Sequence, residues 1–436
     1  MITDTTRGTT PLVARIPGSK SLTNRLLLLA AAAEGTSRIH APLVGEDTLA
    51  FRGALRECGI PVRVGPLEEF WEVTGAGRGP TGRARLWCAD AGTAARFLPP
   101  FAATGHGTFL FDGSSQLRAR PQEPLLEALR GLGSDIEAGP GGGLPLLVRA
   151  EGLAGGTIAV ESSPSSQYLS GLLMAAPLMR TGLRVRTRGL VSRPYVDMTL
   201  ALMRRYGAGV TEGADGDLRV GPGPYTATDS VVEPDASTAS YAFAAAAVTG
   251  RTVTVPGLGA GSLQGDLRFV EILAKAGAEV RVDETATTVT GTGRLRGGFA
   301  VDMGDVSDTF MTLAAIAPLA DAPITVLGIG HTRLKESDRI AAVAQNLRAC
   351  GIETAEGSDW ITVYPGTPRS ARVSCRRDHR IAMAFSVLGL TIPDTLTLDD
   401  PHCVAKTFPA FHSELRRLFP WYELPAGTDE SIEEHR

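Results

Sequence analysis

The stretch "GSKSLTNRLLLLAAAAEG", residues 18–35, joins a short polar segment to a long apolar run. Ser19, Ser21 and Thr23 are residue types that cap helix N-termini, and Gly35 is suited to end the helix that the apolar run predicts. Taken alone, the stretch indicates a polar helix start and nothing more specific. Its meaning changes because the same arrangement recurs along the chain.

The chain contains six such openings, in which small or polar residues lead into an alanine-rich helix. They begin at residues 18, 90, 163, 235, 305 and 377, so the steps between them are 72, 73, 72, 70 and 72 residues. Five of them are followed by strand-like sequence and then by a second amphipathic helix that ends at a glycine, as in residues 49–62 and 340–353. Steps that agree this closely argue against chance similarity between alanine-rich helices.

A period near 70 residues is longer than a typical solenoid repeat. Six units of β-α-β-α-β-β type, grouped as two lobes of three, fit the length better. The 436 residues also exceed what one hydrophobic core usually organises, which independently favours two domains.

The charge balance excludes a general electrostatic attraction to nucleic acid or to anionic membranes. The chain has 43 basic and 47 acidic side chains, with 43% hydrophobic residues. Any binding of anions must therefore be local.

The five cysteines are scattered and show no CxxC spacing, which argues against a disulfide framework and against a structural zinc site. Reduced thiols, an N-terminus without an apolar signal core, and the lack of a run of about 18 apolar residues lead us to expect a cytoplasmic protein. The polar, acidic residues 425–436 predict a flexible tail.

The repeat has a chemical consequence. Each opening directs the N-terminus of a helix, with its free N–H groups and partial positive charge, out of a short loop. If these helix ends converge on a cleft between the lobes, they form an anion site without any net basic charge.

The polar side chains at the openings differ from unit to unit, which is where function is expected to reside. They are rich in arginine and lysine, and their acids are Asp308, Glu336, Asp338 and Asp378. Guanidinium groups suit carboxylates and phosphates, so we expect small ligands with several negative charges. For any one arginine, a solvated surface charge is the more common explanation.

Eight motifs, in chain order, carry a family resemblance. They are "PGSKSLTNR", "DAGTAARFL", "SSQYLSGLLMAAP", "SRPYVDMT", "DASTASY", "RLKESDRIAAV", "DHRIAMAF" and "DPHCVAKTFP". Together they resemble the 5-enolpyruvylshikimate-3-phosphate synthase family, the 3-phosphoshikimate 1-carboxyvinyltransferases, from about Pro17 to about Phe411. The whole set is specific, although "AGT" or "SSQ" alone would mean little.

The resemblance implies an α/β (α+β) fold, a two-lobed inverse β-α prism of six β-α-β-α-β-β repeats with three in each lobe. In this family the first strand of the chain completes the C-terminal lobe. We therefore expect an N-terminal lobe at residues 17–232, a C-terminal lobe at residues 1–16 and 233–424, and the tail at 425–436.

The resemblance also implies a reaction. The enolpyruvyl group of phosphoenolpyruvate moves to the 5-hydroxyl of shikimate 3-phosphate by addition and elimination, and phosphate is released. This is the step of aromatic amino acid biosynthesis, in the shikimate pathway, that glyphosate targets. It implies these two small-molecule substrates. We also expect a monomer, no cofactor, no metal, and no nucleic-acid or membrane partner.

Residues that match the family's site follow from the motifs. The catalytic set is Lys20, Asp308 and Glu336, with Asp308 as the base for the hydroxyl and the other two as proton carriers at the alkene. The phosphoenolpyruvate set is Lys20, Gly92, Arg120, Gln167, Arg339, Arg380 and Lys406. The shikimate 3-phosphate set is Lys20, Ser21, Arg25, Ser165, Ser166, Gln167, Ser192, Tyr195, Asp308, His331 and Lys335.

Three positions depart from the usual pattern. Asp90 stands where the family usually has asparagine, which places a carboxylate beside an anion site. His331 also replaces an asparagine, and Phe97 stands where many members have proline or leucine. Because of Asp90 and His331, an alternative function remains: a specialised enolpyruvyl transferase that uses another phosphorylated hydroxyl acceptor in secondary metabolism.

Two further alternatives differ more. UDP-N-acetylglucosamine enolpyruvyl transferase has the same architecture but carries a reactive cysteine in the loop before the "ARP" arginine, where this chain reads "GSSQLRARP". A non-catalytic polyanion-binding protein would not need Lys20, Asp308 and Glu336 together.

Overall fold

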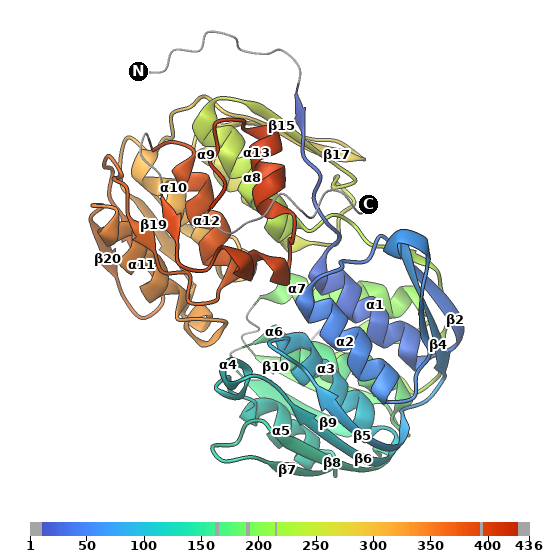
Figure 1. Cartoon of the computed structure of the whole chain (residues 1–436). Helices are drawn as coiled ribbons and strands as arrows, with labels where there is room; N and C mark the ends of the chain where they lie inside the picture. Colours follow the sequence, from blue (N-terminus) through green and yellow to red (C-terminus); the bar gives the residue numbers. More distant parts are fainter. Residues whose placement is uncertain (1–10, 162–164, 189–191, 214–215, 393–395, 426–436) are drawn as a thin grey trace. The chain divides into compact units, whose positions relative to one another are not determined.

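The structure, a computed structural model, describes residues 11–161, 165–188, 192–213, 216–392 and 396–425. The chain forms two compact units (Figure 1). One is continuous, Gly18–Glu233, and the other combines Met1–Pro17 with Pro234–Arg436. Ser163, where the third opening begins, and residues 426–436 of the expected tail lie outside the described residues.

The second repeat shows the predicted plan in full. Its elements are β5 (Thr81–Trp87), α3 (Gly92–Ala103), β6 (His106–Asp112), α5 (Glu123–Gly131), β7 (Asp135–Ala138) and β8 (Leu146–Glu151), with the short α4 (Ser115–Arg118) before α5. β5 pairs in parallel with β6, and β6–β8 and β8–β7 are antiparallel, so the sheet order is β5-β6-β8-β7. The predicted β-α-β-α-β-β order is confirmed in this repeat.

The same order recurs in the other sheets of the continuous unit. The first repeat contains α1 (Lys20–Ala32), β2 (Ala33–His40), α2 (Glu46–Glu57), β3 (Val62–Val64) and β4 (Phe70–Ala76), with β13 (Tyr225–Thr226) and β14 (Ser230–Val231) parallel to β2. The third contains β9 (Gly156–Glu161), α6 (Ser166–Ala175), β10 (Leu183–Arg188), α7 (Arg193–Arg205), β11 (Val210–Glu212) and β12 (Leu218–Val220).

The other unit is completed by a strand from the start of the chain. Its first sheet joins β1 (Leu12–Val13) to β15 (Thr252–Pro256), β17 (Ala286–Thr290) and β16 (Glu279–Val282), with Leu12 opposite Val253. Its second sheet has the order β18 (Phe299–Asp302), β19 (Ile324–Leu327), β21 (Ile361–Val363), β20 (Thr354–Glu356), and its third pairs β22 (Arg372–Val373) with β23 (Thr397–Leu398). The helices are α8 (Ala236–Thr249), α9 (Phe269–Lys275), α10 (Phe310–Ile316), α11 (Arg339–Ala349), α12 (His379–Gly389) and α13 (Phe411–Leu418).

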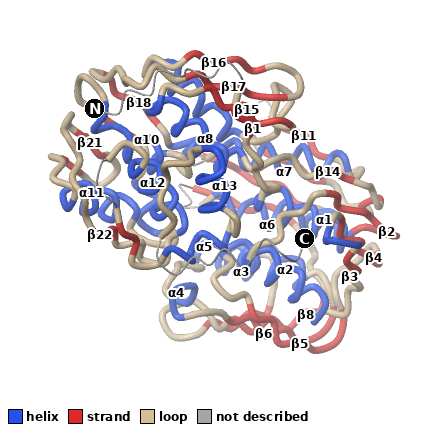
Figure 2. The backbone as a smooth tube through the Cα atoms, turned by 45° about the horizontal axis from the view of Figure 1, so that its top comes forward, coloured by secondary structure: helices blue, strands red, loops and turns tan. Residues whose placement is uncertain are grey.

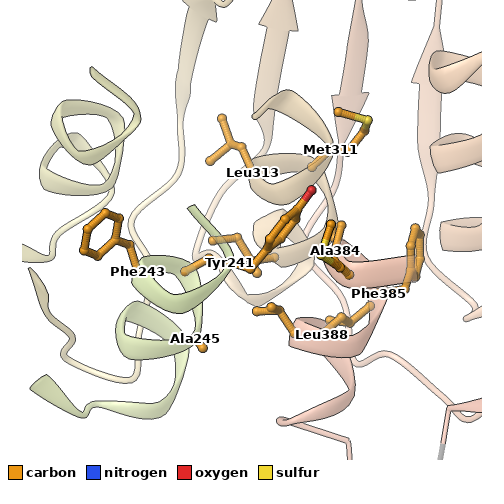
Figure 3. Packing of buried hydrophobic residues seen from close by; sticks show 14 of the residues in the cluster. Tyr241, Phe243, Ala245, Met311, Leu313, Ala384, Phe385 and Leu388 are labelled. Carbon is orange, nitrogen blue, oxygen red and sulfur yellow. The ribbon is translucent and has the colours of Figure 1, made fainter. Parts of the chain in front are cut away.

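The core of each unit is made by the helices of the three openings. In Figure 2 the strands of a unit lie toward its outside and these helices toward its middle. α8, α10 and α12 are almost wholly buried and meet around Tyr241, Leu313 and Phe385 (Figure 3). Alanine-rich faces let the helices approach closely, which explains why the openings have this composition.

Two helix boundaries differ from the sequence prediction. α1 ends at Ala32, and Gly35, expected to end it, lies within β2 at φ 107°. The helix stops early because β4 crosses its end: a Cβ on Gly75 would lie 2.4 Å from the Ala30 carbonyl oxygen.

The fifth opening also starts later than expected. A 3₁₀ turn, η4 (Gly304–Val306), follows Asp302, and α10 begins only at Phe310. Asp308 therefore lies in the turn before the helix. Among the described residues, no helix combines the length and the apolar character that crossing a bilayer requires.

Candidate active site

Lys20 is the first residue of α1. Ser19 caps the helix, with its Oγ accepting a hydrogen bond from the Leu22 N–H at 3.4 Å. The Lys20 ammonium lies 3.2 Å from a carboxylate oxygen of Asp47, near the start of α2, and the two side chains are 12% and 4% exposed. A buried carboxylate thus holds this lysine at the helix start.

Arg25 lies one turn further along α1 and is 1% exposed. Its guanidinium donates to Thr199 Oγ1 at 2.7 Å, to Ser170 Oγ at 3.3 Å, and to the carbonyls of Ser21 and Tyr195 at 3.0 and 3.3 Å. Burial lowers the pKa of Arg25 to about 10. The position of this side chain is fixed by α6 and α7, and it is part of the core as well as a candidate ligand contact.

The Phe97 ring packs against the Arg25 guanidinium group. Its ring centroid lies 5.2 Å from the Arg25 guanidinium carbon, and the ring contacts Phe51 edge-on. A cation above an aromatic face is favourable when both groups are desolvated. Phe97, which departs from the family pattern, therefore contacts Arg25, a residue predicted to bind shikimate 3-phosphate.

A second cationic group surrounds the start of α3. A Cβ on Gly92 would lie 2.9 Å from Arg120 Nη1 and 3.2 Å from Arg96 Nη1. Arg96 donates to Gln167 Oε1 at 2.7 Å, which joins α3 to the start of α6. Glycine is favoured here because a side chain would displace the guanidinium groups, and Gly92 is the first residue of α3, where helix N–H groups can bind an anion.

The serines of the acceptor set lie at two helix starts. Ser165 caps α6, with its Oγ accepting from the Gln167 N–H at 3.3 Å, and Ser166 is the first helical residue. Ser192 precedes α7 in a left-handed conformation, φ 55° and ψ 50°. A non-glycine residue in this conformation costs about 1 kcal/mol or more, and such strain is typical of functional positions.

The carboxylate of Asp90 has a local partner. Ser114 Oγ donates a short hydrogen bond to Asp90 and accepts from the Leu117 N–H at 3.1 Å. This places Asp90 at the start of α4, the turn that leads to Arg120. The residue therefore anchors the arginine-bearing loop.

In the other unit, Asp308 is held by three cations. Its Oδ1 lies 2.5 Å from Lys335 Nζ and 3.0 Å from Arg339 Nη1, and its Oδ2 lies 2.7 Å from Arg380 Nη2. Burial alone would raise the pKa of Asp308, but the charges of Arg380, Lys335 and Arg339 outweigh it and keep this pKa well below its usual range.

Arg339 is the centre of this network. It is 1% exposed, donates from Nη2 to Glu336 at 2.8 Å, and donates from Nε to Asp378 at 2.9 Å. Lys406 Nζ lies 3.7 Å from the other oxygen of Glu336. Burial alone would lower the pKa of Arg339, but the surrounding carboxylates, led by Asp378, raise it.

His331 contacts the same network through a serine. Its Nε2 lies 2.8 Å from Ser307 Oγ, which also accepts from Lys335 Nζ at 3.3 Å. Burial, together with the charge of Lys335, lowers the pKa of His331 to about 3. The ring is therefore neutral at physiological pH and replaces asparagine as an uncharged hydrogen-bonding group.

These arrangements can bind anions and move protons. No group of three or more histidine, cysteine or carboxylate side chains suited to a metal occurs in the described residues. The groups described above are buried cations, helix N-termini and carboxylates, Asp308 and Glu336 among them, next to guanidinium groups.

Comparison with known proteins identifies the family. The profile described as EPSP synthase (3-phosphoshikimate 1-carboxyvinyltransferase) matches residues 7–415. The chain belongs to the EPSP synthase family. A 3-phosphoshikimate 1-carboxyvinyltransferase of Nostoc punctiforme is 41% identical over 409 residues, covering 92% of this chain and 95% of the relative. The chloroplastic enzyme of that name from Arabidopsis thaliana is 38% identical, covering 93% and 82%.

Solved structures of the family agree with the fold. EPSP synthase from Acinetobacter baumannii superposes with a TM-score of 0.77 at 26% identity, over 95% of this chain and 96% of that one. The enolpyruvyl transferase NikO from Streptomyces tendae has a TM-score of 0.75 at 18% identity, over 94% and 96%, which shows a shared fold alone. The two-lobed α/β architecture expected of the family is confirmed.

The structure groups the predicted residues within each unit. The continuous unit carries Lys20, Ser21, Arg25, Gly92, Arg120, Ser165, Ser166, Gln167, Ser192 and Tyr195, and the other carries Asp308, His331, Lys335, Glu336, Arg339, Arg380 and Lys406. The family site prediction did not include Asp47, Arg96, Ser307 and Asp378, which contact these residues directly. Asp378, Arg96 and Ser307 lie at openings, so their positions were a usable signal, whereas Asp47 lies outside the openings and had none.

Proposed function

We propose that this chain transfers the enolpyruvyl group of phosphoenolpyruvate to the 5-hydroxyl of shikimate 3-phosphate. Membership of the family supports the reaction. The observation that carries the site assignment is the hydrogen-bonded cluster of Asp308, Glu336, Arg339 and Arg380, because it joins two proton-transfer carboxylates to two anion-binding guanidinium groups.

The two ends of the donor call for different contacts. Arg339 and Arg380 each bind one oxygen of the Asp308 carboxylate. Because this geometry suits a carboxylate, the pair is expected to bind the carboxylate of phosphoenolpyruvate. The phosphate of phosphoenolpyruvate is expected to contact Lys20, the Gly92 N–H, Arg120, Gln167 and Lys406.

The acceptor has its own set of candidate contacts. The serines at the starts of α6 and α7 suit the phosphate of shikimate 3-phosphate, and Ser21 with Arg25 suit its ring carboxylate. His331 and Lys335 lie beside Asp308, where the reacting hydroxyl is expected.

The proposed residues take the following parts in the reaction. A proton is added to the terminal alkene carbon by Glu336 or Lys20, while Asp308 accepts the proton of the 5-hydroxyl as its oxygen bonds to the neighbouring carbon. The tetrahedral adduct then loses phosphate as the C–O bond breaks, and a methyl proton returns to Glu336 or Lys20, which restores the alkene. The chain's own residues supply every proton donor and acceptor in this scheme.

We also propose that the chain acts as a monomer in the cytoplasm. The five cysteines are free thiols, in keeping with a reducing compartment. All the proposed ligand contacts are present in one chain.

The decisive experiment measures phosphate release from phosphoenolpyruvate with a panel of acceptors. We expect release with shikimate 3-phosphate and none with shikimate or UDP-N-acetylglucosamine. Release that requires a different phosphorylated hydroxyl compound would instead support the specialised transferase that Asp90 and His331 suggest.

A further inference from the structure

The Arg339–Arg380 pair is already occupied by an internal carboxylate. Asp308 binds Arg339 through Oδ1 at 3.0 Å and Arg380 through Oδ2 at 2.7 Å, one oxygen to each guanidinium group. This is the arrangement in which two arginines bind a ligand carboxylate. Asp308 therefore stands where the carboxylate of phosphoenolpyruvate would bind.

A second carboxylate contacts the same arginines in a different manner. Asp378 is fully buried and accepts from Arg339 Nε and Nη2 at 2.9 and 3.3 Å, and from Ser337 Oγ at 2.9 Å. It also caps α12, accepting from the Arg380 N–H at 3.1 Å. These contacts tie Asp378 to the backbone of the helix that carries Arg380.

Within the described part of the chain, Asp308 accepts no hydrogen bond from the backbone of a helix start. It lies in the turn between η4 and α10, its side chain is 18% exposed, and its hydrogen-bond partners are the ends of three long side chains. Moving it requires rotation of side chains only, whereas moving Asp378 would uncap a buried helix. The two carboxylates therefore differ in how easily they can be displaced.

We propose that Asp378 is a positioning residue that permanently orients Arg339 and Arg380, whereas Asp308 is a placeholder that the donor's carboxylate displaces. This inference rests on the proposed function. Displacement couples donor binding to catalysis, because Asp308 loses its two guanidinium partners and keeps Lys335. A carboxylate with fewer cationic partners is a stronger base, so Asp308 becomes able to accept the hydroxyl proton only when the donor is in place.

The test is calorimetric titration of the full chain with phosphoenolpyruvate in the absence of acceptor. We compare Asp308→Asn and Asp378→Asn with the unchanged protein. Asp305→Asn is the matched control, because Asp305 lies on the same turn but is exposed and pairs with Arg268 at 3.3 Å. Inorganic phosphate, which has no carboxylate, serves as the second ligand.

We expect Asp308→Asn to bind phosphoenolpyruvate at least 5-fold more tightly, or to bring binding into the measurable range, with the affinity for phosphate changed by less than 2-fold. Asp378→Asn should weaken phosphoenolpyruvate binding at least 10-fold, and Asp305→Asn should change nothing.

If Asp308→Asn bound phosphoenolpyruvate as weakly as the unchanged protein or more weakly, Asp308 would not be a placeholder. If it bound phosphate more tightly by the same factor, the cause would be a general charge effect, which would also overturn the proposal. If Asp378→Asn fails to fold, Ser337→Ala, which removes one of its donors, replaces it and should raise the KM for phosphoenolpyruvate without changing that for the acceptor. An equal rise in both would overturn the positioning role. Failure of the proposed function would appear separately, as no phosphate release by the unchanged protein with shikimate 3-phosphate.

Discussion

The proposed anion-binding residues of the two units lie at corresponding helix starts, but their arginines have different partners. In the continuous unit, Arg25 hydrogen-bonds to hydroxyls and carbonyls and Arg96 to an amide, although Lys20 pairs with the Asp47 carboxylate. In the other unit, both Arg339 and Arg380 pair with carboxylates. Neutral partners leave a cation's charge available to a ligand, whereas carboxylate partners must move or share it.

The difference suggests a division of labour. A site whose arginines have neutral acceptors as partners is suited to holding phosphates throughout the reaction. A site in which carboxylates and guanidinium groups alternate is suited to proton transfer, because small displacements change the pKa of each acid. The repeat supplies the scaffold, and the polar residues at each opening determine which task a unit performs.

The strongest test of this comparison is Asp308→Ala. We expect turnover to fall by about 10²- to 10⁴-fold, the usual contribution of a general base. Binding of phosphoenolpyruvate should not weaken, because the guanidinium groups remain. Steady-state turnover together with donor affinity checks both statements. Near-normal turnover would remove Asp308 from the catalytic set.

Lys20→Met tests the continuous unit in the same way. This lysine is proposed to contact both substrates and to carry a proton, so we expect turnover to fall about 100-fold and both Michaelis constants to rise. Lys20 also pairs with buried Asp47, so the melting temperature should be followed. Normal kinetics with a lowered melting temperature would reduce the residue to a helix-start charge.

Arg25→Ala should combine two effects, because the arginine is both buried and a proposed ligand contact. We expect the KM for shikimate 3-phosphate to rise by the equivalent of about 2 kcal/mol, and the free energy of unfolding to fall by about 3 kcal/mol as hydroxyls of α6 and α7 lose their partner. Exposed Arg38→Ala is the control for stability. A loss of stability with unchanged acceptor binding would leave Arg25 a core residue only.

Gly92→Ala sharpens the donor side of the comparison. The added Cβ would lie 2.9 Å from Arg120 Nη1, so the guanidinium must shift. We expect the KM for phosphoenolpyruvate to rise several-fold, about 1 kcal/mol, with the acceptor's KM unchanged. Equal rises in both would mean that the start of α3 serves the two substrates alike.

The smallest effect concerns His331 and pH. Its pKa is lowered to about 3 in the folded protein, so between the ordinary value near 6.5 and 3 the unfolded chain binds the proton that the folded chain does not. Folding therefore loses stability as the pH falls through this range, by about 1 kcal/mol at pH 5 for a partly exposed ring. Asn at this position should remove that loss. Chemical denaturation of His331→Asn at pH 5 and pH 7 measures it, and an equal pH dependence in both proteins would contradict it.

The repeat and the core could be read from the sequence because they depend on local features. Alanine-rich helices, glycines at their ends and a regular spacing are properties of short segments. The family motifs also named guanidinium and carboxylate residues that lie near one another in the unit that contains Pro234–Arg436, and their roles in binding and catalysis stay predictions.

The contacts between distant segments could not be read in this way. Lys20 meets Asp47, and Arg339 meets Asp378, only because helices from different parts of a unit are brought together. The early end of α1 depends on β4, which crosses it at Gly75, and the burial of Arg25 depends on α6 and α7. Such features require the tertiary structure, since no local pattern encodes them.

The path of the chain between the units has a consequence for its synthesis. Residues 18–233 begin and end beside each other, where the Ser19 N–H donates to the Glu233 carbonyl at 2.8 Å, and the Asp235 N–H donates to the Pro17 carbonyl at 2.9 Å. The continuous unit can thus complete its sheets while the remainder is still on the ribosome. Leu12, which is made before the continuous unit, pairs with Val253 of β15 only after that unit has been made. The continuous unit is thus inserted into the sequence of the other unit. We expect the other unit to complete its fold last.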